Sequence, residues 1–232
     1  MEQLKIIKKL SIWIFIVPFV TVNACLIFVI YFQQFLTPGD GIGFTIPYID
    51  GGTSISRTAR VFPTYFLFKP AMFLTAFLLI KFWSNYSLLI NTIDDKNNYS
   101  KYFKFFGIAS AIMLIMHSIF LGVKFDIAIY KFFRRFIMLS FVIFELAAQI
   151  LLTINFYKIR LKLINLISKK VLVLKIALVS LLTGVALVSA PFLIMEGNKY
   201  FKHALEWDFF VGILLFYLLS HFFWSENSGP HT

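Results

Sequence analysis

Two ionisable side chains lie inside long apolar stretches of this sequence. Glu145 occurs in the run FVIFELAAQI, and His117 occurs in GIASAIMLIMHSIFLGV. An ionised carboxylate without a partner is costly in hydrocarbon, so we expect Glu145 to be protonated or paired, with His117 or Lys69 as its partner. Imidazole titrates near neutrality, which would make His117 the general acid or base of an acyl transfer or hydrolysis. His117 and Glu145 are therefore candidate catalytic residues. The alternative is a neutral Glu145 that joins two helices through one hydrogen bond.

A polar stretch, GIGFTIPYIDGGTSISRTARVFPTYFLFKP from Gly41 to Pro70, interrupts the apolar sequence. Its turn residues expose backbone N–H groups and hydroxyls that could cradle a phosphate, and its arginines could pair with the charge. It lacks the strand-GxxxxGK[ST]-helix context of a nucleotide-binding loop. We predict that it binds a lipid headgroup through Asp50, Ser54, Arg57 and Arg60, joined by Arg134 from a later segment. The alternative is a structured lid in which Asp50 pairs with an arginine.

A second polar pair, His203 and Glu206, precedes the last apolar run. Their i, i+3 spacing places both on one face of a helix, and Trp207 beside them is typical of a membrane interface. We include both in the predicted lipid site, and a simple polar cap is the alternative. A metal site would need a third ligand such as His117, and no HxxxH or HxxEH spacing supports one. We therefore predict no metal and no cofactor.

The composition requires lipid as the solvent for much of the chain. Of 232 residues, 59% are hydrophobic, 19% are aromatic and only 14% are charged. Soluble domains are about half apolar and about a quarter charged. We predict an all-α fold, a polytopic bundle of six transmembrane helices in a single domain over residues 1–232, with a long structured outer loop at about 33–63. The expected spans are about 11–32, 64–89, 105–123, 136–157, 171–195 and 209–224.

The basic residues indicate the orientation of these spans. The net charge is +11, but the lysines and arginines follow the membrane boundaries, so we do not expect nucleic acid as a partner. An even number of spans puts both termini on one side. With that side inside, thirteen basic residues lie in inner segments and nine in outer ones. This bias favours cytoplasmic termini, in a bacterial inner membrane or a eukaryotic endomembrane.

The loop and the last span resemble one known family. The segments IPYIDGGTSISRTARVFPTYF and HALEWDFF, with six spans, are similar to the Frag/DRAM/Sfk family, which includes the Cwh-type N-terminal domain and the post-GPI-attachment remodelling factor. Pro47-Tyr48-Ile49 and Gly51-Gly52 fit its first lumenal loop. Asp50 replaces the usual serine, and Ser56-Arg57 stand where proline is expected. The resemblance implies a membrane protein that works on or with lipids or lipid-anchored proteins.

These observations favour a protein that binds, remodels or organises membrane lipids through an outer-leaflet site. No serine nucleophile elbow is visible, so the sequence favours binding over an enzymatic reaction. One alternative is a small proton- or solute-conducting transporter, with a path lined by Asn23, His117, Glu145 and Gln149. The other is a non-catalytic scaffold or homo-oligomer that packs through its small residues Ala147, Ala148, Ala186 and Ala190.

Overall fold

The computed structural model describes residues 2–36, 42–94, 99–123, 127–163, 166–195 and 197–224. Six helices in this part of the chain are long and apolar enough to cross a membrane. They are α1 (Glu2–Tyr31), α5 (Thr64–Ile93), α6 (Tyr99–Phe120), α7 (Ala128–Ile159), α8 (Lys169–Ile194) and α9 (Lys199–Phe223). The predicted all-α, six-span polytopic bundle is confirmed, and the chain is a multi-pass membrane protein.

Three short helices complete the described structure. α2 (Gln33–Leu36) follows α1, while α3 (Pro47–Asp50) and α4 (Ile55–Ala59) lie in the long first connection. We call residues 42–63, which contain α3 and α4, the lid. Residues 37–41 of the predicted outer loop lie outside the described residues.

Several helix ends differ from the predicted spans. α1 begins at Glu2 rather than near residue 11, so the basic N-terminal lead continues the first span. α7 begins at Ala128 rather than near 136, and its first turns include Arg134 and Arg135. Long arginine side chains can reach the interface from within a helix, so basic residues do not mark its backbone boundary. α9 begins at Lys199 rather than near 209, because the lid covers its polar first turns.

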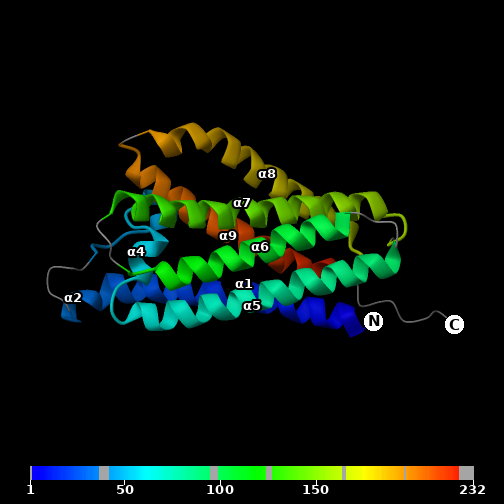
Figure 1. Cartoon of the computed structure of the whole chain (residues 1–232), viewed down its shortest axis with the longest axis horizontal. Helices are drawn as coiled ribbons and strands as arrows, with labels where there is room; N and C mark the ends of the chain where they lie inside the picture. The colour runs from blue at the N-terminus through cyan, green and yellow to red at the C-terminus, as the bar shows by residue number, and fades with distance from the viewer. Residues whose placement is uncertain are drawn as a thin grey trace.

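The long helices form a ring around the bundle axis. α1 packs on α5 and α9, α5 on α6, and α6 on α7, while α7 also contacts α9. Figure 1 shows the lid and α2 at the end of the bundle opposite the start of α1. We call the end of the bundle that carries the lid the loop end, and the end where α1 starts the terminal end. His221 near the end of α9 lies 3.0 Å from the Lys8 carbonyl oxygen, which joins both terminal helices at the terminal end.

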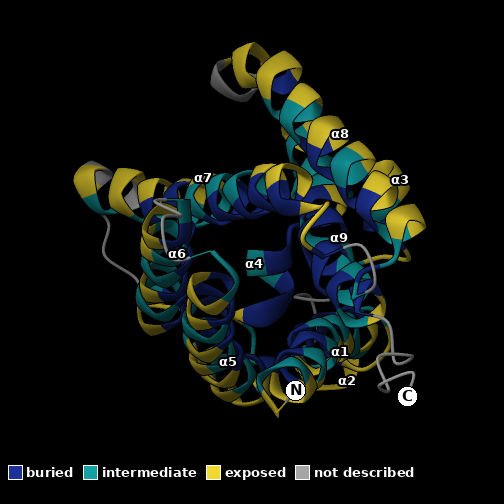
Figure 2. Cartoon of the chain, turned by 90° about the vertical axis from the view of Figure 1, so that its right-hand side faces the viewer, coloured by how far each residue is buried: buried dark blue, intermediate teal, exposed yellow. Residues whose placement is uncertain are grey.

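α4 crosses the ring at the loop end. Figure 2 looks along the helices from the terminal end and shows α4 in the middle of the ring formed by α1, α5, α6, α7 and α9. α8 contacts only α7 and α9 among the long helices and diverges from the bundle. Much of the surface of α8 is exposed leucine and valine, as expected for a helix surrounded by lipid.

Aromatic packing fills the terminal half of the ring. Trp83 of α5 meets Phe103 of α6 and Tyr217 of α9 at ring-centroid distances of 6.1 and 6.3 Å. Gly107 makes the approach of α5 to α6 possible, since a Cβ built there would lie 2.2 Å from the Trp83 ring. Lipid gives little hydrophobic drive for helix association, so close packing of this kind holds the bundle together.

Candidate functional site

The first half of the lid is organised around Asp50. Its carboxylate accepts hydrogen bonds from the Thr45 hydroxyl at 2.6 Å, the Gly52 N–H at 2.8 Å and the Ile46 N–H at 2.9 Å. These donors, the Thr45 hydroxyl first, hold the pKa of Asp50 below its ordinary value. Asp50 was predicted to contact a headgroup or an arginine, and the structure shows its oxygens bound within the lid itself.

The second half of the lid is the short helix α4, which is capped from two sides. The Ser54 hydroxyl accepts from the Arg57 N–H at 3.2 Å, so Ser54 is the N-cap. The carboxylate of Glu206 on α9 faces the backbone N–H groups of Ser56 and Ile55. A carboxyl oxygen can accept hydrogen bonds from the backbone N–H groups at this end of a helix. Ser54 and Glu206 therefore fix the position of α4.

The lid is fastened to α9 and α1 by polar and aromatic contacts. His203 lies 3.0 Å from the Gly51 carbonyl oxygen, and Trp207 donates to the Thr53 carbonyl oxygen at 2.9 Å. Tyr48 packs edge-on against Trp207 and donates to Asn23 of α1 at 2.8 Å. His203 is thus a docking residue that holds the lid on the bundle.

Gly51 makes the close approach of the lid to α9 possible. Its φ of +61° lies in the left-handed region, and a Cβ there would lie 1.8 Å from the Tyr200 carbonyl oxygen. Only glycine satisfies both conditions at little cost. The Asp50-Gly51-Gly52 turn of the sequence is therefore a docking feature of the backbone.

Docking of the lid places three arginines at the loop end, with Arg60 within electrostatic range of both of the others. Partial burial lowers the pKa of Arg60, and the nearby positive charges of Arg134 and Arg57 lower it further. Arg134, which comes from α7, is also within electrostatic range of His117 on α6. We call Arg57, Arg60 and Arg134 the arginine cluster. Of the predicted lipid-binding residues, Arg57 and Arg134 lie within electrostatic range of Arg60, and the predicted catalytic residue His117 lies within such range of Arg134.

The arginine cluster has no salt bridge to a carboxylate of the described residues. The ion pair that these residues do form joins Lys162 to Asp94, away from the cluster. The guanidinium carbon of Arg134 lies 6.0 Å from the ring centroid of Tyr130. Positive charges collected without an acid are suited to an anionic ligand.

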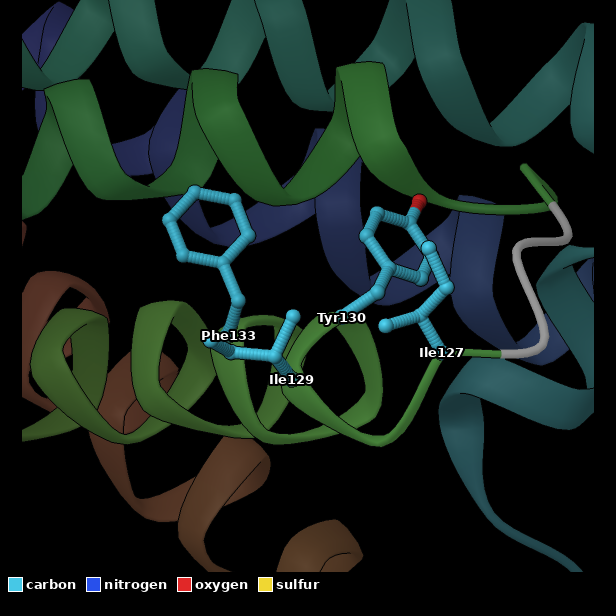
Figure 3. A pocket seen from close by; sticks show the side chains of 4 residues that line it. All are labelled: Ile127, Ile129, Tyr130 and Phe133. Carbon is cyan, nitrogen blue, oxygen red and sulfur yellow. The ribbon is translucent and has the colours of Figure 1, made fainter.

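An apolar groove lies next to Arg134 at the start of α7. Ile127, Ile129, Tyr130 and Phe133 line this groove, which has a volume of about 430 Å³. Figure 3 shows Tyr130 and Phe133 extending from the start of α7 toward the neighbouring helix. The Tyr130 hydroxyl donates to the Phe120 carbonyl oxygen of α6 at 3.1 Å, which fixes this wall of the groove.

Glu145 lies deeper, in a separate cluster of polar side chains. It is fully buried and accepts from Ser110 of α6 at 2.6 Å and from Gln149 at 3.1 Å. Tyr217 of α9 donates to the same carboxyl group. His117 is not among these partners, although α6 and α7 are neighbours. His117 is two turns from Ser110 toward the loop end.

The depth of Glu145 differs from the prediction for a physical reason. A span starting near 136 predicts a depth of about 13 Å at 1.5 Å per residue. Because α7 begins at Ala128, Glu145 lies about 26 Å along the helix from its first residue. It therefore occupies the middle of α7 and is separate from the loop end.

Sequence reasoning missed a second buried ionisable group, Lys175 of α8. It is one of the thirteen basic residues assigned to inner segments in the sequence analysis, yet its side chain is fully buried. Its nitrogen donates to Ser220 of α9 at 2.7 Å. The position of Lys175 in the sequence could have indicated this burial, because it lies six residues inside α8 rather than at the end of the helix.

No family model matches the chain, no curated protein is significantly similar to it, and no solved structure matches its fold. The resemblance to the Frag/DRAM/Sfk family stays a prediction. Within the described ranges, no three His, Cys, Asp or Glu side chains gather in a way that could hold a metal ion. The fold and these contacts define the class as a multi-pass membrane protein with a lid over one end.

Proposed function

We propose that the protein binds an anionic membrane lipid at the loop end. The headgroup phosphate lies among Arg57, Arg60 and Arg134, and an acyl chain follows the groove lined by Tyr130 and Phe133. The observation that carries this proposal is the arginine cluster, which comes from two distant segments and has no salt bridge to a carboxylate of the described residues.

Electrostatics and position both support this ligand. Like charges in a partly buried site repel one another, and a bound phosphate would offset that repulsion. Guanidinium groups bind phosphate oxygens with paired, charge-assisted hydrogen bonds. The cluster adjoins the end of a membrane-spanning helix, where lipid headgroups are the most abundant phosphates. The positive-inside count would put this end in the outer leaflet.

The proposed role is binding rather than a chemical reaction. Among the residues that the structure describes, His117 makes no hydrogen bond to a hydroxyl or thiol that it could activate. Nucleophilic catalysis requires such a pairing. His117 contributes polar surface beside Arg134.

Binding of dioctanoyl phosphatidylglycerol to the purified full chain in neutral detergent tests the proposal, with dioctanoyl phosphatidylcholine as the zwitterionic comparison. The anionic lipid is expected to bind more tightly. A charge-assisted hydrogen bond contributes about 1.5–3 kcal/mol, so Arg57→Gln, Arg60→Gln and Arg134→Gln should each weaken binding about 10-fold or more.

Arg135→Gln is the matched control, because Arg135 is exposed on the same helix and the same charge is removed. It should leave binding within about twofold of the unmodified protein. Equal affinity for the two lipids, or an equal loss in Arg135→Gln, would remove the arginine cluster from the function.

A further inference from the structure

A second groove lies between α5 and α6 at the terminal end of the bundle. It has a volume of about 420 Å³ and is lined by residues from both helices. α5 ends and α6 starts at this end, opposite the lid (Figure 1), and the two helices pack against each other. The groove beside Arg134 lies at the start of α7, at the loop end. The two grooves are therefore separate and lie at opposite ends of the membrane-spanning helices.

The charged residues of this groove lie near the ends of the two helices. Lys101 and Lys104 line it from α6, two and five residues from Tyr99, the first residue of that helix. Their i, i+3 spacing puts both on one side of α6. Asn91 lines the groove from α5, two residues before Ile93, the last residue of that helix. At 1.5 Å per residue, all three lie within about 8 Å of a helix end, which is the depth of a lipid headgroup.

The donors of these three side chains are available to a ligand. Among the described residues, the side chains of Lys101, Lys104 and Asn91 form no hydrogen bond and no salt bridge. Asp94, just beyond the end of α5, forms a salt bridge with Lys162. Lys101 and Asn91 are exposed, and Lys104 is half-buried. Ammonium and amide N–H groups both donate hydrogen bonds to phosphate oxygens.

The deeper part of the groove is apolar and follows α6 toward the middle of the membrane. Phe105, Ile108 and Ile112 line it, and both Phe105 and Ile112 are exposed on the outside of the bundle. Ile112 lies 13 residues from the start of α6, or about 20 Å along the helix. The short side chains of Ala109 and Ser87 leave room between the two helices. Charged groups at headgroup depth with an apolar wall below them match the two parts of a phospholipid.

We propose that the groove between α5 and α6 binds an anionic phospholipid of the leaflet at the terminal end. The phosphate lies between the ammonium groups of Lys101 and Lys104, and the amide of Asn91 is a third donor. One acyl chain follows α6 from Phe105 to Ile112. Basic pockets between membrane-spanning helices are a typical setting for anionic headgroups.

The two positive charges favour a lipid with a net negative charge. A zwitterionic headgroup would bring its own ammonium group close to the lysines, and like charges repel one another. The positive-inside count would put the terminal end in the inner leaflet, whose anionic lipids attract basic groups at the ends of membrane-spanning helices. The arginine cluster lies at the opposite end of the bundle, so the two sites would hold different lipid molecules. This proposal does not depend on lipid binding at the loop end.

Native mass spectrometry of the full chain in neutral detergent tests this proposal, because it counts the lipids that each protein molecule retains. The probes are dioctanoyl phosphatidylglycerol and, as the zwitterionic comparison, dioctanoyl phosphatidylcholine. The double variant Lys101→Gln, Lys104→Gln should retain one phosphatidylglycerol fewer than the unmodified protein, with affinity at that site lowered about 10-fold or more. The double variant Lys169→Gln, Lys170→Gln is the matched control, because these exposed lysines start α8 and do not line the groove. It should bind the lipid as the unmodified protein does.

Ala109→Phe separates a lipid held in the groove from lipid attracted to the surface by charge alone. This substitution fills the groove and leaves the charge unchanged, so it should remove the same lipid molecule as the lysine variant. Arg60→Gln acts at the loop end and should leave this molecule bound, so the two lipid proposals can fail independently. Three results would overturn this one: equal retention of phosphatidylglycerol in the Lys101, Lys104 variant and its control, unchanged binding in Ala109→Phe, or equal binding of phosphatidylcholine at this site.

Discussion

Trp207→Phe should release the lid from the bundle. The Trp207 side chain is fully buried on α9, packs against Tyr48 and donates its indole N–H to the Thr53 carbonyl oxygen. Phenylalanine retains an aromatic ring at this position but has no donor. Thr53 is fully buried as well, so its carbonyl would lose this partner in a place that water does not reach.

The size of the effect follows from that lost hydrogen bond. A buried acceptor left without a donor costs about 1–3 kcal/mol. This cost applies to the docked lid and not to an open lid, whose carbonyl is hydrated. The open population should therefore rise about 5- to 150-fold, since 1.4 kcal/mol corresponds to a factor of ten.

Amide hydrogen exchange of the lid measures this population in the intact protein. Suitable reporters are the N–H groups of Asp50, Gly51 and Thr58, which are bonded within α3 and α4. Their exchange should accelerate by the same factor, while amides in the middle of α5 keep their rates. Trp13→Phe is the control, because Trp13 is 46% exposed on the outside of α1. Unchanged lid exchange in Trp207→Phe, or an equal increase in Trp13→Phe, would refute the assignment of Trp207 as a docking residue.

Two further predictions concern packing and pH. Gly107→Ala puts a methyl group 2.2 Å from the Trp83 ring. This substitution should lower the free energy of unfolding by about 1–3 kcal/mol. Gly184→Ala is the control, because no atom lies within 4 Å of the new Cβ, and it should raise the free energy of unfolding by up to about 1 kcal/mol. Thermal unfolding in detergent compares the two, and a stable Gly107→Ala protein would contradict the α5–α6 packing. Hydrogen bonds from the Thr45 hydroxyl and from the Gly52 and Ile46 N–H groups lower the pKa of Asp50 in the docked lid. These hydrogen bonds stabilise the docked lid fully above the unfolded pKa of about 3.9. This stabilisation is lost as pH falls through the lowered pKa of Asp50. Exchange in the lid, corrected for intrinsic rates, should therefore increase below about pH 4 in the unmodified protein, and Asp50→Asn should abolish this step.

The helices were predictable from the sequence, whereas their ends required the structure. A run of about twenty apolar residues has few alternatives to a spanning helix. The helix ends depend on what covers the polar residues there. The segment before residue 209 looks like a polar connection, but it is helical because Trp207 and His203 contact the lid. Such tertiary contacts leave no mark in local hydropathy.

The candidate site was predictable in its location but not in the roles of its residues. The glycine and proline turns and the two arginines of the lid indicated a structured cover over one end. The same polar stretch also contains Asp50 and Ser54, whose oxygens the lid uses for itself. Residue type does not distinguish a ligand-binding carboxylate from one that satisfies its own backbone. Lys175 shows the same limit, because its burial results from the packing of α8 on α9.

Helix α9 connects the lid to the two buried ionisable groups, Glu145 and Lys175. Its first turns carry His203, Glu206 and Trp207, which hold the lid and so position Arg57 and Arg60 beside Arg134. Its last turns carry Tyr217 and Ser220, which contact the buried acid and the buried amine. A helix moves along its axis as a nearly rigid body, so a shift that loosens the lid contacts would also change the contacts of Tyr217 and Ser220. Among the described residues, no hydrogen bond joins the loop end directly to Glu145 or Lys175. Any coupling between the loop end and these two buried groups would therefore pass through the position of α9.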